Sequence, residues 1–176
     1  MEVLFVCTGN ICRSPTAERL AVAAAARMQI PAFVAHSAGT RAVIGHGIHK
    51  EAGRVLERLG GDVGGFTARQ LSPKIAGGAD LILAMTRAHR DIVLELAPRK
   101  INVTFTMREA FRLITERGAL SLGDLSEARS QLSAGAWQDV RDPIGESAEV
   151  FDAVGEEIFR LLPPILGLVA SDSKGT

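Results

Sequence analysis

The feature that most constrains this chain is a ten-residue segment near its start, residues 6–15, which reads VCTGNICRSP. It follows an apolar run at residues 3–6 that is typical of a buried strand, and it leads into a helix that Ser14 can cap and Pro15 can start. A strand, a tight loop and a helix N-terminus together form an anion cradle, because loop N–H groups point inward and the helix dipole adds partial positive charge. With Cys7 at its entry and Arg13 at its exit, the loop indicates chemistry on a bound phosphate.

The bulk properties predict one globular domain, residues 1–176, with a substantial core. Twenty basic and twenty acidic side chains cancel, so charge gives no reason to expect nucleic acid or an anionic membrane as a partner. No stretch approaches the ~20 apolar residues that a membrane-spanning helix needs. The last apolar run, residues 161–170, is broken by two prolines, and residues 167–176 are predicted to be a flexible tail.

The two cysteines, Cys7 and Cys12, lie in one loop and therefore staple no distant segments. This usage is typical of a reducing cytoplasm, and no signal peptide is recognisable because Glu2 follows Met1 without a basic segment. Two sulfurs without a nearby pair of histidines do not suit a structural zinc site, so we expect no metal.

Strand and helix patterns alternate along the chain. Short apolar strands are predicted at residues 3–6, 32–35, 81–84 and 103–105, and helices at residues 15–28, 48–59, 87–96, 108–117, 125–132 and 148–162. This alternation predicts an α/β fold: a doubly wound, four-stranded parallel sheet with helices on both faces, a flavodoxin-like three-layer sandwich. Ligands bind such sheets at the carboxyl ends of the strands, where the Cys7 loop is expected to lie.

The residue types in the loop suit covalent chemistry on phosphate. Only a few per cent of free cysteine is ionised at neutral pH, but loop N–H groups, a helix N-terminus and Arg13 all favour the thiolate of Cys7. The planar guanidinium of Arg13 can bind two phosphate oxygens at once, which lysine cannot do. Gly9 is expected to allow a tight turn, and Asn10 tolerates left-handed dihedral angles.

Cleavage of a phosphoester also needs an acid for the leaving oxygen, and Asp142 is the best candidate. Pro143 biases Asp142 toward an extended conformation, which suits a side chain held over a pocket. A nearby thiolate and phosphate would favour the protonated form of Asp142. Asp139 is the rival acid, but no proline follows it.

Three further groups of side chains have more than one interpretation. Cys12 is either a buried spacer or a redox partner that protects Cys7 in a disulfide, if the loop geometry permits. Arg141 is expected to face solvent. The remaining group is the histidines, which are expected to lie at the surface or in hydrogen bonds rather than to be catalytic: His36, His46, His49 and His89.

The chain resembles the low-molecular-weight protein-tyrosine phosphatases, and the whole signature at residues 6–15 is similar to theirs at every position. The resemblance extends to residues 37–40 (SAGT), 68–71 (ARQL) and 79–85 (ADLILAM), and to the acid loop at residues 142–143 (DP). It therefore covers nearly the whole chain with the order of elements preserved.

The resemblance implies a two-step mechanism without a metal or organic cofactor. Cys7 attacks phosphorus while Asp142 protonates the leaving group, and water assisted by Asp142 then hydrolyses the cysteinyl-phosphate. Arg13 and the loop amides stabilise the equatorial oxygens, and Ser14 and Asn10 support the thiolate and the loop shape. The implied partners are a phosphorylated protein or peptide substrate and phosphate or other oxyanions. The implied phosphate-binding residues are Thr8, Gly9, Asn10, Ile11, Cys12, Arg13 and Ser14.

Four positions depart from the pattern that the resemblance implies. Phe66 stands where members often carry a histidine that braces the loop asparagine, so that brace is either missing or supplied otherwise. Residues 144–145 (IG) and 41–44 (RAVI) replace aromatic pocket walls, and the chain has no tyrosine. Residues 118–138 are predicted to be an insertion; its Trp137 either replaces the missing wall or belongs to the core.

These departures leave the substrate open between branches of the family. Residues 142–147 (DPIGES) and 84–86 (AMT) also resemble the protein-arginine phosphatases, which have threonine in place of Ile11. Isoleucine favours an apolar aromatic ring, so phosphotyrosine is the preferred prediction and phosphoarginine the alternative. An arsenate reductase coupled to a small thiol, or a phosphopeptide-binding module without activity, are further alternatives. Intact Cys7, Arg13 and Asp142 argue against the binding module.

Overall fold

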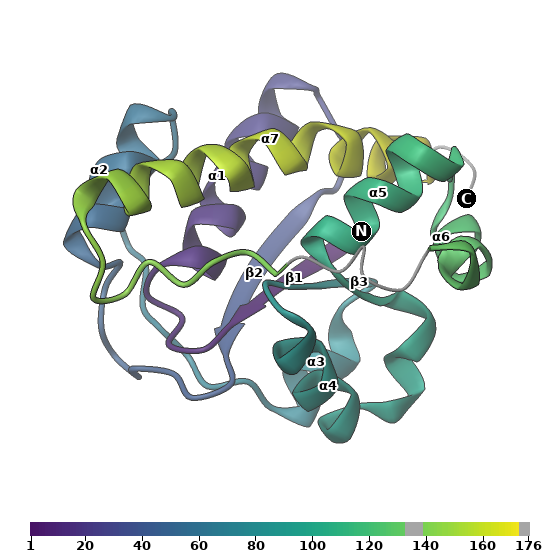
Figure 1. Cartoon of the computed structure of the whole chain (residues 1–176), viewed down its shortest axis with the longest axis horizontal. Helices are drawn as coiled ribbons and strands as arrows, with labels where there is room; N and C mark the ends of the chain where they lie inside the picture. Colours follow the sequence, from purple (N-terminus) through teal and green to yellow (C-terminus); the bar gives the residue numbers. More distant parts are fainter. Residues whose placement is uncertain (133–138, 173–176) are drawn as a thin grey trace.

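A single parallel sheet organises the molecule, which is described from a computed structural model over residues 1–132 and 139–172. The sheet has four strands in the order β2-β1-β3-β4, and every neighbouring pair is parallel (Figure 1). This arrangement confirms the doubly wound topology predicted from the sequence. The strands are β1 (Glu2–Cys7), β2 (Val34–Gly39), β3 (Leu81–Ala84) and β4 (Thr104–Thr106).

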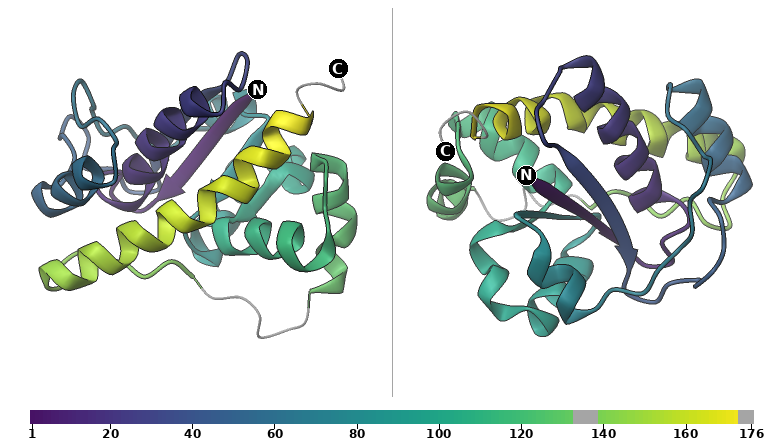
Figure 2. Two further views of the ribbon diagram at one scale, coloured as in Figure 1. Left: turned by 90° about the horizontal axis from the view of Figure 1, so that it is seen from above. Right: turned by 180° about the vertical axis from the view of Figure 1, so that it is seen from behind.

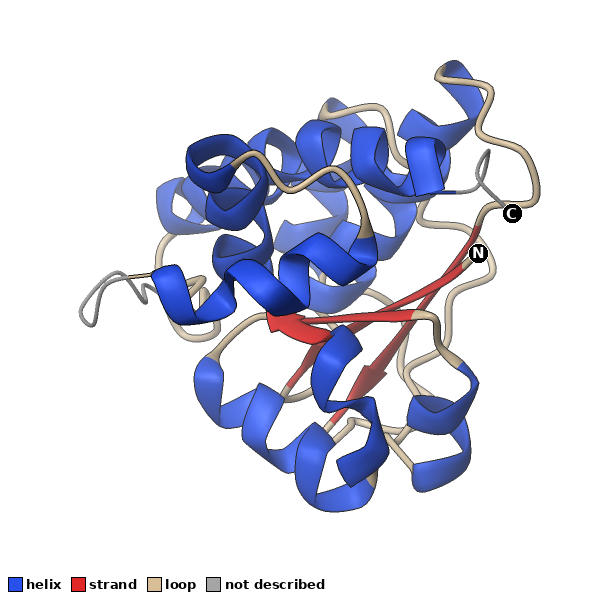
Figure 3. Ribbon diagram, turned by 90° about the vertical axis from the view of Figure 1, so that its right-hand side faces the viewer, coloured by secondary structure: helices blue, strands red, loops and turns tan. Residues whose placement is uncertain are grey.

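Helices cover both faces of this sheet, as Figure 3 shows. Alternate side chains of β1 divide between the two cores: Val3 and Phe5 belong to the larger one, and Leu4 and Val6 to the smaller. Over the larger core lie α1 (Arg13–Arg27), α2 (Lys50–Arg58), α5 (Met107–Arg117), α6 (Leu122–Ala128) and α7 (Ala148–Asp172). Over the smaller core lie α3 (Pro73–Gly78) and α4 (Arg87–Leu96).

Strand pairing moves β2 away from the range predicted by its apolar residues. The predicted strand covers residues 32–35, whereas β2 covers Val34–Gly39 and pairs with β1 from Glu2↔Val34 to Cys7↔Gly39. Ala32 has a φ of 50° and therefore lies in a turn. The sequence prediction ended the strand before its polar residues, His36 and Ser37, but both pair with β1 in the sheet.

Short elements without a clear period were missed or displaced. The sequence predicted neither α3 nor the 3₁₀ segment η1 (Pro98–Val103), each six residues long. The helix predicted at residues 125–132 is α6 followed by the 3₁₀ turn η2 (Arg129–Gln131). α6 packs Leu125 against the larger core, so this part of the predicted insertion is integrated into the fold.

The C-terminal helix corrects the prediction of a flexible tail from residue 167. α7 continues through Pro163 and Pro164 to Asp172 and crosses the molecule beside α1 and α5 (Figure 2). The prolines deprive the carbonyls of Phe159 and Arg160 of helix bonds, but these residues lie on the exposed face, where water can pair with them. Beyond the prolines, apolar side chains are buried in the larger core: Ile165, Leu166, Leu168 and Val169. No helix within the described residues is long and apolar enough to cross a membrane.

Candidate active site

The loop after β1 wraps its backbone around the sulfur of Cys7. The backbone N–H of Asn10 donates to Cys7 Sγ at 3.3 Å, and Ser14 Oγ lies 2.9 Å from the same sulfur. The positive φ of the loop belongs to Asn10, at 55°, as predicted, whereas Gly9 has none. The missing side chain of Gly9 instead keeps the cavity floor open between Ile11 and Val43, whose atoms lie 3.4 and 3.6 Å from where a Cβ would stand.

Ser14 does not cap the helix, contrary to the prediction. α1 begins at Arg13, with Cys12 in the preceding position and no side-chain cap. The hydroxyl of Ser14 faces Cys7 and accepts a hydrogen bond from Asn10 Nδ2 at 2.9 Å. The hydroxyl of Ser14 therefore bonds inside the loop, to Cys7 and Asn10, and not to the helix. Because no side chain caps α1, the N–H groups of its first turn are left for an anion.

A chain of buried hydrogen bonds braces Asn10 although Phe66 replaces the family histidine. Asn10 Nδ2 donates to Ser37 Oγ at 2.8 Å, and Ser37 Oγ donates to Glu18 Oε2 at 2.6 Å. On its other side, Asn10 Oδ1 accepts from the backbone N–H of Arg69 at 2.8 Å. The brace that the sequence left uncertain is thus supplied from β2 and α1.

The end of β2 packs directly behind the loop. A Cβ on Gly39 would lie 2.4 Å from the carbonyl oxygen of Thr8 and 3.0 Å from the Cβ of Asn10. Only glycine allows this approach without displacing the loop backbone. Sequence reasoning noted the segment SAGT but not this requirement.

Arg13 connects the loop to the segment that carries the predicted acid. Its side chain is buried, and its Nη1 donates to the carbonyl of Val140 at 3.0 Å. Its Nη2 donates to Asp142 Oδ2 in a direct ion pair, although the two residues are 129 positions apart. The backbone N–H of Ile144 donates to the other oxygen of Asp142 at 3.2 Å and orients the carboxylate. The fold thus brings together the predicted trio Cys7, Arg13 and Asp142.

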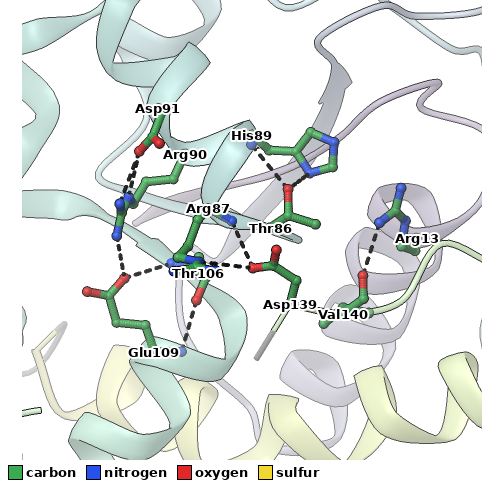
Figure 4. A network of polar contacts seen from close by, with 10 residues as sticks. All are labelled: Arg13, Thr86, Arg87, His89, Arg90, Asp91, Thr106, Glu109, Asp139 and Val140. Carbon is green, nitrogen blue, oxygen red and sulfur yellow. Dashed lines mark hydrogen bonds and ion pairs between the residues drawn. The ribbon is translucent and has the colours of Figure 1, made fainter. Parts of the chain in front are cut away.

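The rival acid, Asp139, is engaged elsewhere. Its Oδ1 accepts from the backbone N–H of Arg87 at 2.9 Å, at the first turn of α4 (Figure 4). Its position there matches a carboxylate that stabilises a helix N-terminus. Arg141 faces solvent, as expected, and pairs with Glu146 at 2.7 Å.

A cavity of about 410 Å³ opens above the loop. Its walls are aliphatic, from Ile11, Val43 and Ile144, and Arg41 stands at its rim. Trp137, predicted as either a wall or a core residue, lies outside the described residues. The residues that line the cavity are Cys7, Thr8, Gly9, Ile11, Cys12, Arg13, Arg41, Val43, Asp142 and Ile144.

Cys12 has the surroundings of a packing residue. It is buried in an apolar cluster with Ala52, Val55 and Phe151. Burial raises the pKa of its thiol to about 12; the charges of Cys7 and Asp142 act in the same direction, and Arg13 opposes them. Cys12 is therefore a neutral thiol at physiological pH, which supports the spacer interpretation; the redox partnership stays a prediction.

His89 is hydrogen-bonded, as expected, but its contact with the loop after β1 was missed by sequence reasoning. This buried side chain lies with Nε2 2.8 Å from Thr8 Oγ1 and Nδ1 2.9 Å from Thr86 Oγ1, whose contact is drawn in Figure 4. Burial lowers the pKa of His89 to about 4, and the positive charge of Arg13 adds to this effect. The only signal in the sequence was a threonine three residues earlier, which can cap the helix.

Metal ligands are not gathered here. Within residues 1–132 and 139–172, no group of three or more histidine, cysteine or acidic side chains could hold a metal ion. The donors found beside Cys7 are the backbone N–H of Asn10 and the guanidinium of Arg13, which suit an oxyanion.

The fold and the site define an α/β protein with an oxyanion-binding loop around a cysteine, at the carboxyl edge of a parallel sheet. Residues 2–174 match the model of the low molecular weight phosphotyrosine protein phosphatase family, and the chain belongs to this family of phosphoester hydrolases.

Relatives come from both branches of the family. The chain is 31% identical to a protein-arginine-phosphatase of Geobacillus stearothermophilus, covering 92% of this chain and 90% of that one. It is 30% identical to the low molecular weight protein-tyrosine-phosphatase PtpB of Staphylococcus epidermidis, covering 94% and 96%. Among solved structures, a YwlE arginine phosphatase mutant with a phosphorylated active-site serine superposes with a TM-score of 0.79, at 26% identity over 99% of both chains.

Proposed function

We propose that this protein hydrolyses phosphotyrosine in proteins through a cysteinyl-phosphate intermediate. The observation that carries the proposal is the geometry around Cys7. Its sulfur contacts the backbone N–H of Asn10 and the hydroxyl of Ser14, and it lines one cavity with Arg13 and Asp142. A nucleophile, an oxyanion clamp and an acid therefore face the same space.

In the first step, the thiolate of Cys7 forms a bond to phosphorus as the bond to the tyrosyl oxygen breaks. Asp142 gives its proton to that oxygen, so tyrosine leaves as a neutral phenol. Arg13 and the loop amides bind the three equatorial oxygens, where negative charge is greatest. Because Arg13 holds Asp142 directly, a phosphoryl group that binds Arg13 also releases the carboxyl group toward the leaving oxygen.

In the second step, Asp142 accepts a proton from water, whose oxygen attacks phosphorus. The sulfur–phosphorus bond breaks, inorganic phosphate forms, and Cys7 returns to the thiolate. The hydroxyl of Ser14, 2.9 Å from the sulfur, stabilises that anion as it forms.

The walls of the cavity support an aromatic substrate. Ile11, Val43 and Ile144 offer aliphatic surface to a phenyl ring, and none of them pairs with a guanidinium group. Phosphoarginine is the second candidate, because a protein-arginine-phosphatase and a YwlE structure are among the relatives that match this chain. A thioredoxin-coupled arsenate reductase needs further cysteines, but the chain has only Cys7 and Cys12. We place the activity in the cytoplasm on the basis of this cysteine usage.

The test compares the hydrolysis of matched phosphotyrosine and phosphoarginine peptides. We expect a higher kcat/KM for phosphotyrosine, and a shift of the ratio toward phosphoarginine in Ile11→Thr, which supplies the hydroxyl of the other branch. A preference of the native protein for phosphoarginine would overturn the substrate assignment.

The nucleophile is tested separately with Cys7→Ser. We expect turnover to vanish while phosphate still binds, whereas Cys12→Ser keeps turnover. Hydrolysis by Cys7→Ser at the native rate would contradict the covalent mechanism. Arsenate-dependent thiol oxidation without phosphatase activity would support the reductase instead.

A further inference from the structure

His89 joins the phosphate loop to the first turn of α4 through two threonine hydroxyls. Its Nε2 contacts Thr8 Oγ1 at 2.8 Å, and its Nδ1 contacts Thr86 Oγ1 at 2.9 Å. His89 is 6% exposed, so water competes little for either nitrogen. A neutral imidazole carries one proton, and its position determines the direction of both hydrogen bonds.

The two threonines differ in what can accept their hydroxyl protons. Thr86, the N-cap of α4, already accepts the backbone N–H of His89 at Oγ1 over 3.2 Å. Among the contacts within the described residues, Nδ1 of His89 is the acceptor available to the proton of Thr86. The Nδ1–H tautomer would leave that proton outside these contacts, whereas the Nε2–H tautomer leaves out the proton of Thr8 instead. Thr8 lines the cavity, where a bound oxyanion can accept its proton, so the geometry favours a proton on Nε2 and an accepting Nδ1.

The position of the His89 proton determines the direction of the hydrogen bond to Thr8, which lines the cavity with Cys7 and Arg13. Nε2–H donates to Thr8 Oγ1, so the proton of Thr8 has no partner in this chain of bonds and is free for an acceptor in the cavity. We propose that His89 is a positioning residue that presets the hydroxyl of Thr8 as a hydrogen-bond donor to the bound phosphoryl group. This inference rests on the proposed function and adds a side-chain donor to the loop amides and Arg13.

The surroundings of His89 keep the arrangement in place. Burial and the charge of Arg13 hold the imidazole neutral at physiological pH, while Asp142 and Asp139 act in the opposite direction. A protonated imidazole would donate from both nitrogens and could no longer accept from Thr86. Because the donor is oriented before substrate arrives, no reorganisation is needed when the phosphoryl group binds.

The tautomer can be measured on the native protein. Long-range proton–nitrogen correlation NMR at pH 7 should show His89 as the Nε2–H tautomer, distinct from the exposed His46. An Nδ1–H tautomer would overturn the inference, because Thr8 would then donate to the imidazole rather than into the cavity.

The donor itself is tested with inorganic phosphate as the probe, by calorimetry and therefore independently of turnover. We expect Thr8→Val to bind phosphate about tenfold more weakly, and Thr8→Ser to stay within about twofold of the native protein. Thr115→Val, which removes a hydroxyl on the exposed face of α5, is the matched control. Equal phosphate affinity of Thr8→Val and the native protein would refute the assignment.

The dependence on His89 is tested with a double-mutant cycle. His89→Leu should weaken phosphate binding in the native background and have no further effect in Thr8→Val, whereas independent effects would contradict the coupling. If His89→Leu does not fold, the NMR measurement of the tautomer and the phosphate affinities of the Thr8 variants still test the inference. If the native protein binds phosphate in a Thr8-dependent way but hydrolyses no phosphopeptide, the proposed function is refuted and this inference still holds.

Discussion

At the scale of residues, donor and acceptor can be assigned in each hydrogen bond of the chain that leads from Glu18 to Cys7. A carboxylate only accepts, so Ser37 donates to Glu18 and must accept from Asn10. Asn10 also donates to Ser14, whose proton is then free for the sulfur of Cys7. The order of the whole chain of hydrogen bonds thus begins at Glu18, a residue that does not touch the cavity.

Glu18→Gln tests this order. A neutral glutamine no longer holds the hydroxyl of Ser37 in a charge-assisted hydrogen bond, so we expect kcat to fall about tenfold, consistent with the loss of that bond. Alkylation of Cys7 by iodoacetamide should slow as well, because the thiolate loses support. Glu57→Gln, an exposed position on α2, is the control. Native alkylation and turnover rates in Glu18→Gln would contradict the role of Glu18.

Asp142→Asn tests the competition for Arg13. The carboxylate of Asp142 pairs with Arg13 and competes with phosphate for its guanidinium group, so a neutral amide should tighten phosphate binding. The same substitution removes the acid and should lower kcat by about 10²–10⁴-fold. Calorimetry with phosphate and steady-state kinetics measure the two effects. Asp139→Asn should preserve kcat, and the reverse pattern would make Asp139 the acid.

At the scale of elements, the loop depends on what β2 and α4 place behind it. Gly39 lets β2 pass close to the loop backbone, since a Cβ there would lie 2.4 Å from the carbonyl oxygen of Thr8, and α4 presents His89 from its first turn. The contact of each residue with Thr8 has no local sequence signal, because Thr8 lies at least 31 positions away from both.

Gly39→Ala tests the approach of β2. A Cβ only 2.4 Å from the carbonyl of Thr8 must push the loop backbone aside, so we expect a loss of about 1–3 kcal/mol in the free energy of unfolding and a fall in kcat/KM. Gly47→Ala, where nothing lies within 4 Å, should leave both unchanged. Chemical unfolding and kinetics on both variants check the prediction, and an unaffected Gly39→Ala would show that the loop adapts.

His89 makes stability depend on pH. Its pKa in the folded state is about 4, below the value of 6.5 that it takes without burial, so the unfolded chain binds more protons between these values. The stability from the neutral imidazole is complete above pH 6.5 and is lost as the pH falls toward 4, by about 3 kcal/mol in total. Unfolding curves of the native protein and His89→Gln should show a steeper acid loss in the native protein. Parallel curves would contradict the assignment.

At the scale of the whole molecule, α7 closes the larger core over α1 and α5. Its residues beyond the two prolines bury four aliphatic side chains, Ile165, Leu166, Leu168 and Val169. Burial of such a side chain contributes about 1.5–3 kcal/mol, so together they are comparable to the ~5–15 kcal/mol stability of a typical domain.

Truncation tests the contribution of this helix. A chain ending at residue 162 should unfold or melt far below the native temperature, whereas one ending at residue 172 should keep the native Tm. Thermal unfolding followed by circular dichroism measures both. A native Tm for the shorter chain would contradict this contribution of α7 to stability.

The sequence by itself determined the parallel sheet, the order of the longer helices and the meeting of Cys7, Arg13 and Asp142. It could do so because short apolar strands and the VCTGNICRSP loop are local signals, and the carboxyl ends of parallel strands share one edge. Tertiary structure alone decided that Ser14 leaves the end of α1 uncapped and that Glu18 and His89 lie in hydrogen bonds to the loop network. The physical reason is that the direction of a buried hydrogen bond depends on its partners, and those partners come together only when the chain folds.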